Sequence, residues 1–173
     1  MRKTRNLTET AIAVALAVVC HFVKIWEMPQ GGAVSFTMVP ILFIAIRRGP
    51  LAGFATGGIY GLISLIFHGI IFHPMSVLLD YILAFGALGI AGFFPETLRG
   101  VIFGSITAVG ARFLSSFISG AVLFGSYAPV GQSPWLYSLV YQLTYMVPEL
   151  IIALAVLITL YVKFPGLFRG NFR

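Results

Sequence analysis

Long uncharged apolar stretches, separated by short loops rich in Pro and Gly, dominate this 173-residue sequence. Only 9% of the residues are charged, and the mean hydropathy is +0.99. A soluble domain carries about 25% charged residues, so these few charges cannot cover a water-facing surface. Because a helix needs about 20 apolar residues to cross a bilayer, the chain has room for six or seven spans in one domain. The sequence therefore predicts a polytopic α-helical protein embedded in the lipid bilayer.

Six transmembrane helices account for the apolar stretches. The expected spans are residues 7–25, 38–46, 51–67, 76–94, 100–124 and 135–162. The second span is too short to cross alone at ~1.5 Å per residue. We expect it either to use part of residues 31–37 or to be a broken helix buried in protein.

The basic residues predict the orientation of this single six-helix domain. Nine of them fall on one side of a six-span topology: Arg2, Lys3, Arg5, Arg47, Arg48, Arg99, Lys163, Arg169 and Arg173. The opposite loops, residues 26–37, 68–75 and 125–134, contain no Lys or Arg, and Lys24 is expected to snorkel from the end of the first span. Since cytoplasmic loops carry the excess of Lys and Arg, both termini are predicted to be cytoplasmic. Small clusters of this kind indicate topology and not binding to nucleic acid.

Small residues repeat at helical spacing in two spans. In the third span, Gly53, Gly57 and Gly61 lie four residues apart, which allows another helix to approach closely; packing within the bundle is the expected role. In the first span, two overlapping pairs form an Ala stripe: Ala11 with Ala15, and Ala13 with Ala17. That stripe is expected to face either its own bundle or another protein, and periodicity does not distinguish the two.

Away from the ends of the spans lie three charged residues, and each is costly there and therefore informative. Arg112 lies ~18 Å and Glu149 ~21 Å below the outer ends of their helices, so an Arg112–Glu149 ion pair is expected. Asp80 lies only ~6 Å inside the outer end of its helix, with no basic residue at its level. Its carboxylate is expected either to accept hydrogen bonds from Tyr, Ser or Gln neighbours or to hold a cationic or amine-bearing ligand.

The outer parts of the last two spans supply partners for a pocket around Asp80. Within ~12 Å of the outer ends lie Ser116, Phe124, Tyr137, Tyr141 and Gln142. An aromatic stripe is usually core or an interfacial belt. Hydroxyl and amide groups interleaved with rings fit a small polar aromatic ligand stacked on those rings.

Motifs along nearly the whole chain give it a family resemblance. They are Thr8-Glu9-Thr10-Ala11, Met28-Pro29-Gln30-Gly31-Gly32, Pro40-Ile41-Leu42 before Arg47-Arg48-Gly49, Leu79-Asp80-Tyr81, Leu88 to Gly92, Phe117-Ile118-Ser119-Gly120, Ser126 to Pro129, Trp135 to Ser138 and Lys163 to Phe168. In this order they resemble the thiamine-specific substrate-binding (S) component of energy-coupling factor vitamin transporters.

The resemblance implies a six-helix S-component fold in a prokaryotic cell membrane, with a ligand pocket open to the outside. It implies that the Ala-rich first helix, through Ala11 and Ala15, docks on a transmembrane coupling subunit driven by two ATPases. The chain has no P-loop, so it is expected not to be an enzyme and to need no cofactor. The lipid bilayer is its remaining partner.

The family's pocket residues transfer in part. Its acidic-Tyr pair falls on Asp80 and Tyr81, and its helix-six tyrosine falls on Tyr137. Three positions depart from the family: Ser116 replaces a histidine, Phe124 a tryptophan and Gln142 an asparagine. A loop-one tryptophan has no aligned counterpart, although Trp26 is nearby. Each loss of a stacking or hydrogen-bonding partner costs ~1–3 kcal/mol, so the expected ligand is thiamine or a related small heteroaromatic compound.

Two other classes of protein remain as alternatives. An intramembrane enzyme would need paired catalytic groups at one depth, and no HExxH or GxSxG motif occurs. His21, His68 and His73 are candidate metal ligands, although interfacial histidines are commoner than ligands. A stand-alone channel or facilitator is the second alternative, and co-purification with a coupling subunit and ATPases would distinguish it from an S component.

Overall fold

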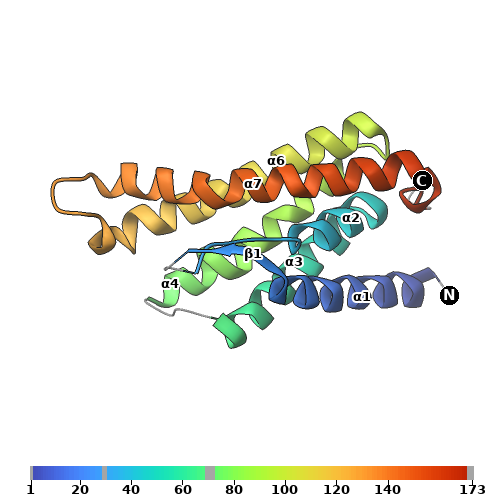
Figure 1. Ribbon diagram of the computed structural model, residues 1–173. Coiled ribbons are helices and arrows are strands. Elements are labelled where there is room, and N and C mark those ends of the chain that lie inside the picture. The colour runs from blue at the N-terminus through green and yellow to red at the C-terminus, as the bar shows by residue number, and fades with distance from the viewer. Residues whose placement is uncertain (1, 29–30, 69–72, 171–173) are drawn as a thin grey trace.

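The computed structural model is a bundle of helices that describes residues 2–28, 31–68 and 73–170 (Figure 1). Both termini lie at one end of the bundle, and the strands, α4 and the loop from α6 to α7 extend toward the other end. The elements in order are α1 (Arg2–Phe22), β1 (Lys24–Glu27), β2 (Ala33–Ser35), α2 (Met38–Arg48), α3 (Pro50–His68), α4 (Pro74–Ser76), η1 (Val77–Leu83), α5 (Ala84–Gly86), η2 (Ala87–Phe93), α6 (Leu98–Val122), η3 (Gly125–Tyr127), α7 (Pro134–Lys163) and η4 (Pro165–Leu167).

The six-helix prediction is confirmed, because α4, η1, α5 and η2 run on as one helical span. In the described part of the chain, four helices are long and apolar enough to cross a membrane: Pro50–Phe67, Pro74–Phe93, Leu98–Val122 and Pro134–Lys163. Their outward faces carry large exposed apolar side chains that lipid would cover, among them Ile59, Ile66, Phe103, Leu114, Val140 and Ile151.

The first span ends earlier than predicted, at Phe22 and not at residue 25. Lys24 begins β1, which pairs with β2 in an antiparallel hairpin. β-Branched and aromatic residues such as Ile25 and Trp26 favour such strands. Lys24 therefore does not lie at the end of the first helix, as predicted, and its Nζ contacts Glu27 Oε1 at 2.6 Å.

The short second span is an unbroken helix buried in protein, so the predicted burial is confirmed and the predicted break in the helix does not occur. α2 has 11 residues, or ~16 Å of helix, and Ile41, Leu42 and Ala45 are fully buried. The other outcome, extension through residues 31–37, is wrong, since β2 occupies Ala33–Ser35. A non-helical backbone at membrane depth is tolerated when its polar groups pair and protein surrounds it.

The Ala stripe of α1 is divided between two environments. Ala13 and Ala17 are buried against the bundle, whereas Ala11 and Ala15 are exposed. Neighbouring Ile12 and Leu16 are exposed as well. One smooth face of α1 therefore serves internal packing, and the adjacent face is open on the outside of the bundle.

The Gly repeat of α3 allows the close helix contact predicted from its spacing. A Cβ atom at Gly57 would overlap the backbone carbonyl of Phe85, and one at Gly61 would overlap that of Tyr81. At Gly53, the Cβ would lie 2.6 Å from the Cα of Gly89. Because glycine alone permits this distance, α3 fixes the position of the span that carries η1 and α5.

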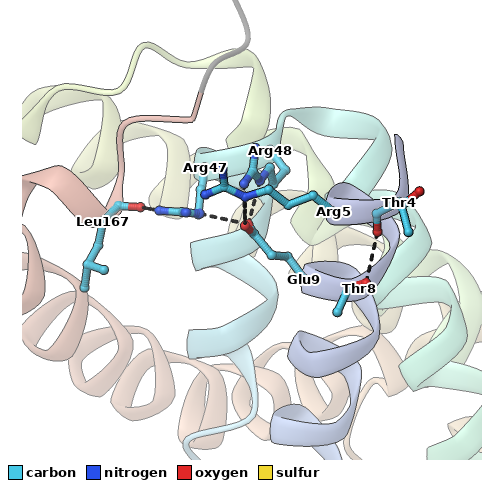
Figure 2. A network of polar contacts seen from close by, with 7 residues as sticks. All are labelled: Thr4, Arg5, Thr8, Glu9, Arg47, Arg48 and Leu167. Atoms are coloured by element: carbon cyan, nitrogen blue, oxygen red, sulfur yellow. Dashed lines mark hydrogen bonds and ion pairs between the residues drawn. The ribbon is translucent and has the colours of Figure 1, made fainter. Parts of the chain in front are cut away.

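A cluster of arginines around Glu9 joins α1 to α2 at the end of the bundle that holds the termini (Figure 2). Arg5 Nε, Arg47 Nε and Arg48 Nε donate to the Glu9 carboxylate at 3.1, 3.0 and 2.6 Å, respectively. A second donor of Arg48 also contacts Glu9, and Arg47 donates to the carbonyl of Leu167. Arginines predicted only as topology signals therefore also connect α1, α2 and the C-terminal turn.

We expect Glu9→Gln to lower the free energy of unfolding by ~1–3 kcal/mol, because Arg48 is buried and would lose its charged acceptor. Thermal unfolding in detergent measures the change. The matched control is Glu27→Gln, which breaks the half-exposed pair with Lys24 and should cost less than ~1 kcal/mol. Equal losses in the two variants would contradict a structural role for the Glu9 cluster.

Candidate ligand-binding pocket

A cavity of about 160 Å³ lies between α1, α3, α6, α7 and the span containing η1. Residues 31–33 and Tyr127, which lie outside the long helices, contribute to its lining. Its lining is made of His21, Gly31, Gly32, Ala33, Tyr60, Ser64, Asp80, Tyr81, Phe85, Arg112, Ser116, Gly120, Phe124, Tyr127, Tyr137, Ser138, Tyr141, Gln142 and Tyr145.

All six residues predicted to bind a ligand line this one cavity: Asp80, Tyr81, Ser116, Phe124, Tyr137 and Gln142. Five of them come from three helical spans, η1, α6 and α7, whereas Phe124 lies just beyond the end of α6, which stops at Val122 and not at residue 124. Their convergence is a property of the fold, whereas their contact with a ligand stays a prediction.

Asp80 lies in η1, a π-helical stretch whose wider turn leaves backbone groups for partners outside the helix. Ser115 Oγ donates to the Leu79 carbonyl at 2.6 Å, which ties η1 to α6. Ser119 Oγ donates to Asp80 Oδ2 at 2.5 Å. One carboxylate oxygen is thus held by the protein while the residue faces the cavity, so both predicted roles of Asp80 are compatible with its position.

Gln142 is held in place by protein groups at both ends of its amide. Nε2 donates to the Ser116 carbonyl at 3.0 Å, and Oε1 accepts from the Tyr145 hydroxyl at 2.5 Å. Ser138 Oγ donates to the Phe117 carbonyl at 2.8 Å. These bonds fasten α7 to α6 along one wall of the cavity.

Aromatic hydroxyl groups are concentrated in the cavity, which six of the seven tyrosines of the chain line. The ring centroids of Tyr137 and Tyr141 lie 6.1 Å apart, and those of Tyr141 and Tyr145 lie 5.8 Å apart. The hydroxyl of Tyr141 accepts a hydrogen bond from the Gly32 amide at 3.0 Å. The tyrosine stripe of α7 therefore forms a pocket wall and anchors the segment that follows β1.

The sequence prediction missed the contribution of α1 and α3 to the cavity. The Tyr60 hydroxyl and His21 Nδ1 form a hydrogen bond of 2.8 Å, and the Tyr60 ring packs 4.7 Å from that of Phe85. The i, i+4 spacing of Tyr60 and Ser64 does indicate a polar face on α3. Nothing in that spacing tells which neighbouring helix the face meets.

Arg112 and Glu149 form the predicted ion pair, with Nη1 3.3 Å from Oε2. Arg112 also lines the cavity that contains Asp80, which the sequence did not predict. Asp80 itself contacts Ser119, about two helical turns from Arg112 along α6, which agrees with the predicted difference in depth between Asp80 and Arg112.

Trp26 is half-exposed on β1 and is not among the lining residues, so it does not replace the missing loop tryptophan. Of the three histidines, His21 bonds Tyr60, and His73 accepts from the Met75 amide at 3.1 Å to cap α4. The side chain of His68 lies outside the described residues. Within the described residues, no three His, Cys, Asp or Glu side chains group as a metal site would require.

The chain is similar to known proteins over nearly its whole length. The family model described as "Thiamine transporter protein" matches residues 7–169. The thiamine transporter ThiT of Bacillus subtilis is 41% identical over 96% of this chain and 95% of its own length. The corresponding protein of Lacticaseibacillus paracasei is 29% identical over 78% of this chain and 75% of its own.

A solved structure of ThiT from Listeria monocytogenes superposes with a TM-score of 0.90, covering 98% of this chain and 100% of that one at 25% identity. The overall arrangement of the helices is therefore shared over nearly the full length of both chains. The family match extends over nearly the entire sequence, and it separates the chain from the enzyme alternative. This multi-pass membrane protein belongs to the thiamine transporter protein family.

Proposed function

We propose that this chain is the substrate-binding S component of an energy-coupling factor importer and that thiamine is its ligand. The observation that carries the proposal is the cavity, which combines a tyrosine-rich wall with the Asp80 carboxylate. Rings of this kind stack on heteroaromatic ligands and attract cations through their faces. The names of the Bacillus subtilis and Lacticaseibacillus paracasei relatives support the same ligand.

The charges in the cavity suit a ligand with one positive charge. Arg112 and Glu149 lie in contact and cancel each other, which leaves Asp80 as the net charge. Thiamine consists of a neutral aminopyrimidine joined to a cationic thiazolium ring. Asp80 would accept a hydrogen bond from its amino group or balance its charge, since a carboxylate does both well in a water-poor site.

The other predicted residues have distinct tasks around the ligand. Tyr81 and Tyr137 would orient it through their hydroxyl groups, and the Phe124 ring would stack on it near the outer side. Ser116 and Gln142 would shape the wall, since their backbone and amide groups already bond each other. Replacing the family's histidine by Ser116 leaves stacking to the tyrosines.

Calorimetry on the purified full chain tests the ligand. Thiamine is expected to bind with a dissociation constant below about 1 µM, equivalent to about −8 kcal/mol. The separate pyrimidine and thiazole halves are expected to bind more weakly, because each fills only part of the cavity. Absence of sub-micromolar thiamine binding, with sub-micromolar binding of another heteroaromatic nutrient, would contradict thiamine as the ligand.

We further propose that both termini are cytoplasmic and that α1 docks on a transmembrane coupling subunit. The Lys and Arg distribution supports this orientation, and both termini share one end of the bundle (Figure 1). The exposed face around Ala11 and Ala15 supports the docking site, since small residues let membrane helices approach closely. Two ATPases would drive the coupling subunit.

Ala15→Trp is expected to reduce co-purification of the coupling subunit by about tenfold or more, because a large ring would separate the two helix backbones. Thiamine affinity should stay within about threefold of the unaltered protein, or less than ~1 kcal/mol, since Ala15 does not line the cavity. Pull-down of tagged protein from membranes measures the first and calorimetry the second. The control is Ile66→Trp, at an exposed position on α3; equal loss of the subunit with this variant would contradict docking through α1.

A further inference from the structure

His21 brings a titratable imidazole from α1 to the wall of the cavity. It lies in the last turn of α1 and is half-buried. Among the described residues that line the cavity, it is the one that belongs to α1. An imidazole ordinarily gains its proton near about pH 6.5. Because the proposed ligand is a cation, the charge of this ring bears directly on binding.

The Tyr60 hydroxyl holds the imidazole in place. It lies 2.8 Å from His21 Nδ1, and Tyr60 is 1% exposed and packs on Phe85. The His21 ring also meets the Phe22 ring edge-on, with centroids 5.7 Å apart. A hydroxyl both donates and accepts, so the contact suits a neutral ring, which accepts at Nδ1, and a protonated ring, which donates there. His21 can therefore gain a proton without losing its partner.

The charge balance of the cavity makes ligand binding sensitive to that proton. While His21 is neutral, the ion pair of Arg112 and Glu149 leaves one net negative charge, on Asp80. A proton on His21 brings the net charge of the cavity to zero. A cationic ligand would then lose its net attraction to the site, and this loss is large where little water screens the charges.

Most other titratable groups around His21 keep their charge in neutral and mildly acidic solution. Cys20 precedes it in α1, and tyrosines line the cavity. Thiols ordinarily titrate near about pH 8.5 and phenols near about pH 10, so both stay neutral. Lys24 and Glu27, on the strand after α1, pair with each other at 2.6 Å. The two acidic residues named above are present in every protein compared below, so their titration is common to all of them.

We propose that His21 is a further residue of the ligand site, and that a proton on its ring competes with the cationic ligand for the charge of Asp80. The ligand binds beside the neutral ring, so binding in mildly acidic solution releases the proton. Because this coupling is reciprocal, the affinity must fall as the pH decreases through the titration of the ring and level off above it. This inference rests on the proposed function, with thiamine as the ligand.

Calorimetry on the full chain tests the competition, with His21→Gln as the variant. Gln keeps a polar group for Tyr60 but does not titrate. For a ring of ordinary pKa that must be neutral, thiamine affinity should fall about tenfold further between about pH 7.5 and about pH 5.5 in the unaltered protein than in the variant. Any titration of thiamine itself is common to the two proteins. Titrations in two buffers of different ionisation enthalpy should show proton release on binding to the unaltered protein near about pH 6.5, and not to the variant.

The pH dependence distinguishes a ligand-site role from structural support. A structural role of His21 would weaken binding by the same factor at both pH values; an equal pH dependence in the two proteins would overturn the proposal, as would a pH-independent affinity of the unaltered protein. If His21→Gln does not fold, His21→Phe supplies the same comparison, with a ring that does not titrate.

The neutral pyrimidine half of thiamine is the matched ligand control. Its affinity ratio between the two proteins should change by less than about threefold over the same pH range, and a change as large as that of thiamine would contradict competition between charges. Failure of the unaltered protein to bind thiamine at either pH would contradict the proposed function itself. Thiamine binding with equal pH dependence in the two proteins contradicts only the role of His21.

Discussion

Asp80→Asn is expected to weaken thiamine binding by roughly 100-fold, the upper end of the effect of losing a charged hydrogen-bond partner. The substitution keeps the shape of the side chain but removes the net negative charge of the cavity. Calorimetric titration of the full chain measures the loss. Thermal unfolding of the ligand-free variant should show no loss of stability, because a neutral amide is cheaper to bury than a carboxylate.

The neutral pyrimidine half of thiamine separates the two roles open to Asp80. If the carboxylate balances the charge of the thiazolium, the substitution should weaken thiamine binding more than pyrimidine binding. If it accepts a hydrogen bond from the amino group, both ligands should weaken by a similar factor. Ser119→Ala, which removes one donor to Asp80, is the matched control and should cost less than about tenfold, or ~1.4 kcal/mol. Unchanged thiamine affinity in Asp80→Asn would show that the role assigned to Asp80 is wrong.

Gly57→Ala is expected to lower the free energy of unfolding by ~3 kcal/mol or more, the upper range for overpacking a tight interface. The added Cβ would overlap the carbonyl of Phe85, a backbone atom that cannot rotate away. Moving Phe85 would also shift the ring beneath Arg112 and the helical turn that carries Asp80. Thermal unfolding in detergent and thiamine affinity should therefore fall together.

The neighbouring Gly58 supplies a matched control in the same helix. A Cβ there meets no atom within 4 Å, so Gly58→Ala should leave the stability unchanged or raise it by up to ~1 kcal/mol through lower chain flexibility. Equal destabilisation by the two substitutions would mean that helix flexibility matters at Gly57, and not the contact with Phe85.

Gly57→Leu should prevent recovery of folded protein altogether.

The close contact between the glycines of α3 and the neighbouring span also positions residues of the cavity. Gly57 and Gly61 touch the backbone at Phe85 and Tyr81, so the stripe that brings α3 close also positions the pocket side of the neighbouring span. Ser115 and Ser119 of α6 hold the other side of η1. The Asp80 carboxylate is therefore placed by two helices and not by its own span alone.

Much of the molecule was predictable from sequence because the relevant physics is local. Hydropathy and helical spacing locate spans and faces, which is why the six helices, the Gly contact and the Arg112–Glu149 pair were anticipated. The polar and aromatic residues expected around Asp80 also line one cavity. The family resemblance supplied the pairing of Asp80 with Tyr81 and Tyr137 that spacing alone does not give.

The rotation and tilt of the helices, and the residues at which they end, could not be predicted from the sequence. Nothing in the local pattern shows that β1 pairs with β2, that Trp26 is not among the residues lining the cavity, or that His21 and Tyr60 meet at its wall. The same holds for Arg112, whose depth in α6 predicted a partner but not a place in the pocket. Local sequence sets which side chains share a helix face, whereas the crossing of helices, fixed by close contacts such as that at Gly57, sets which faces meet.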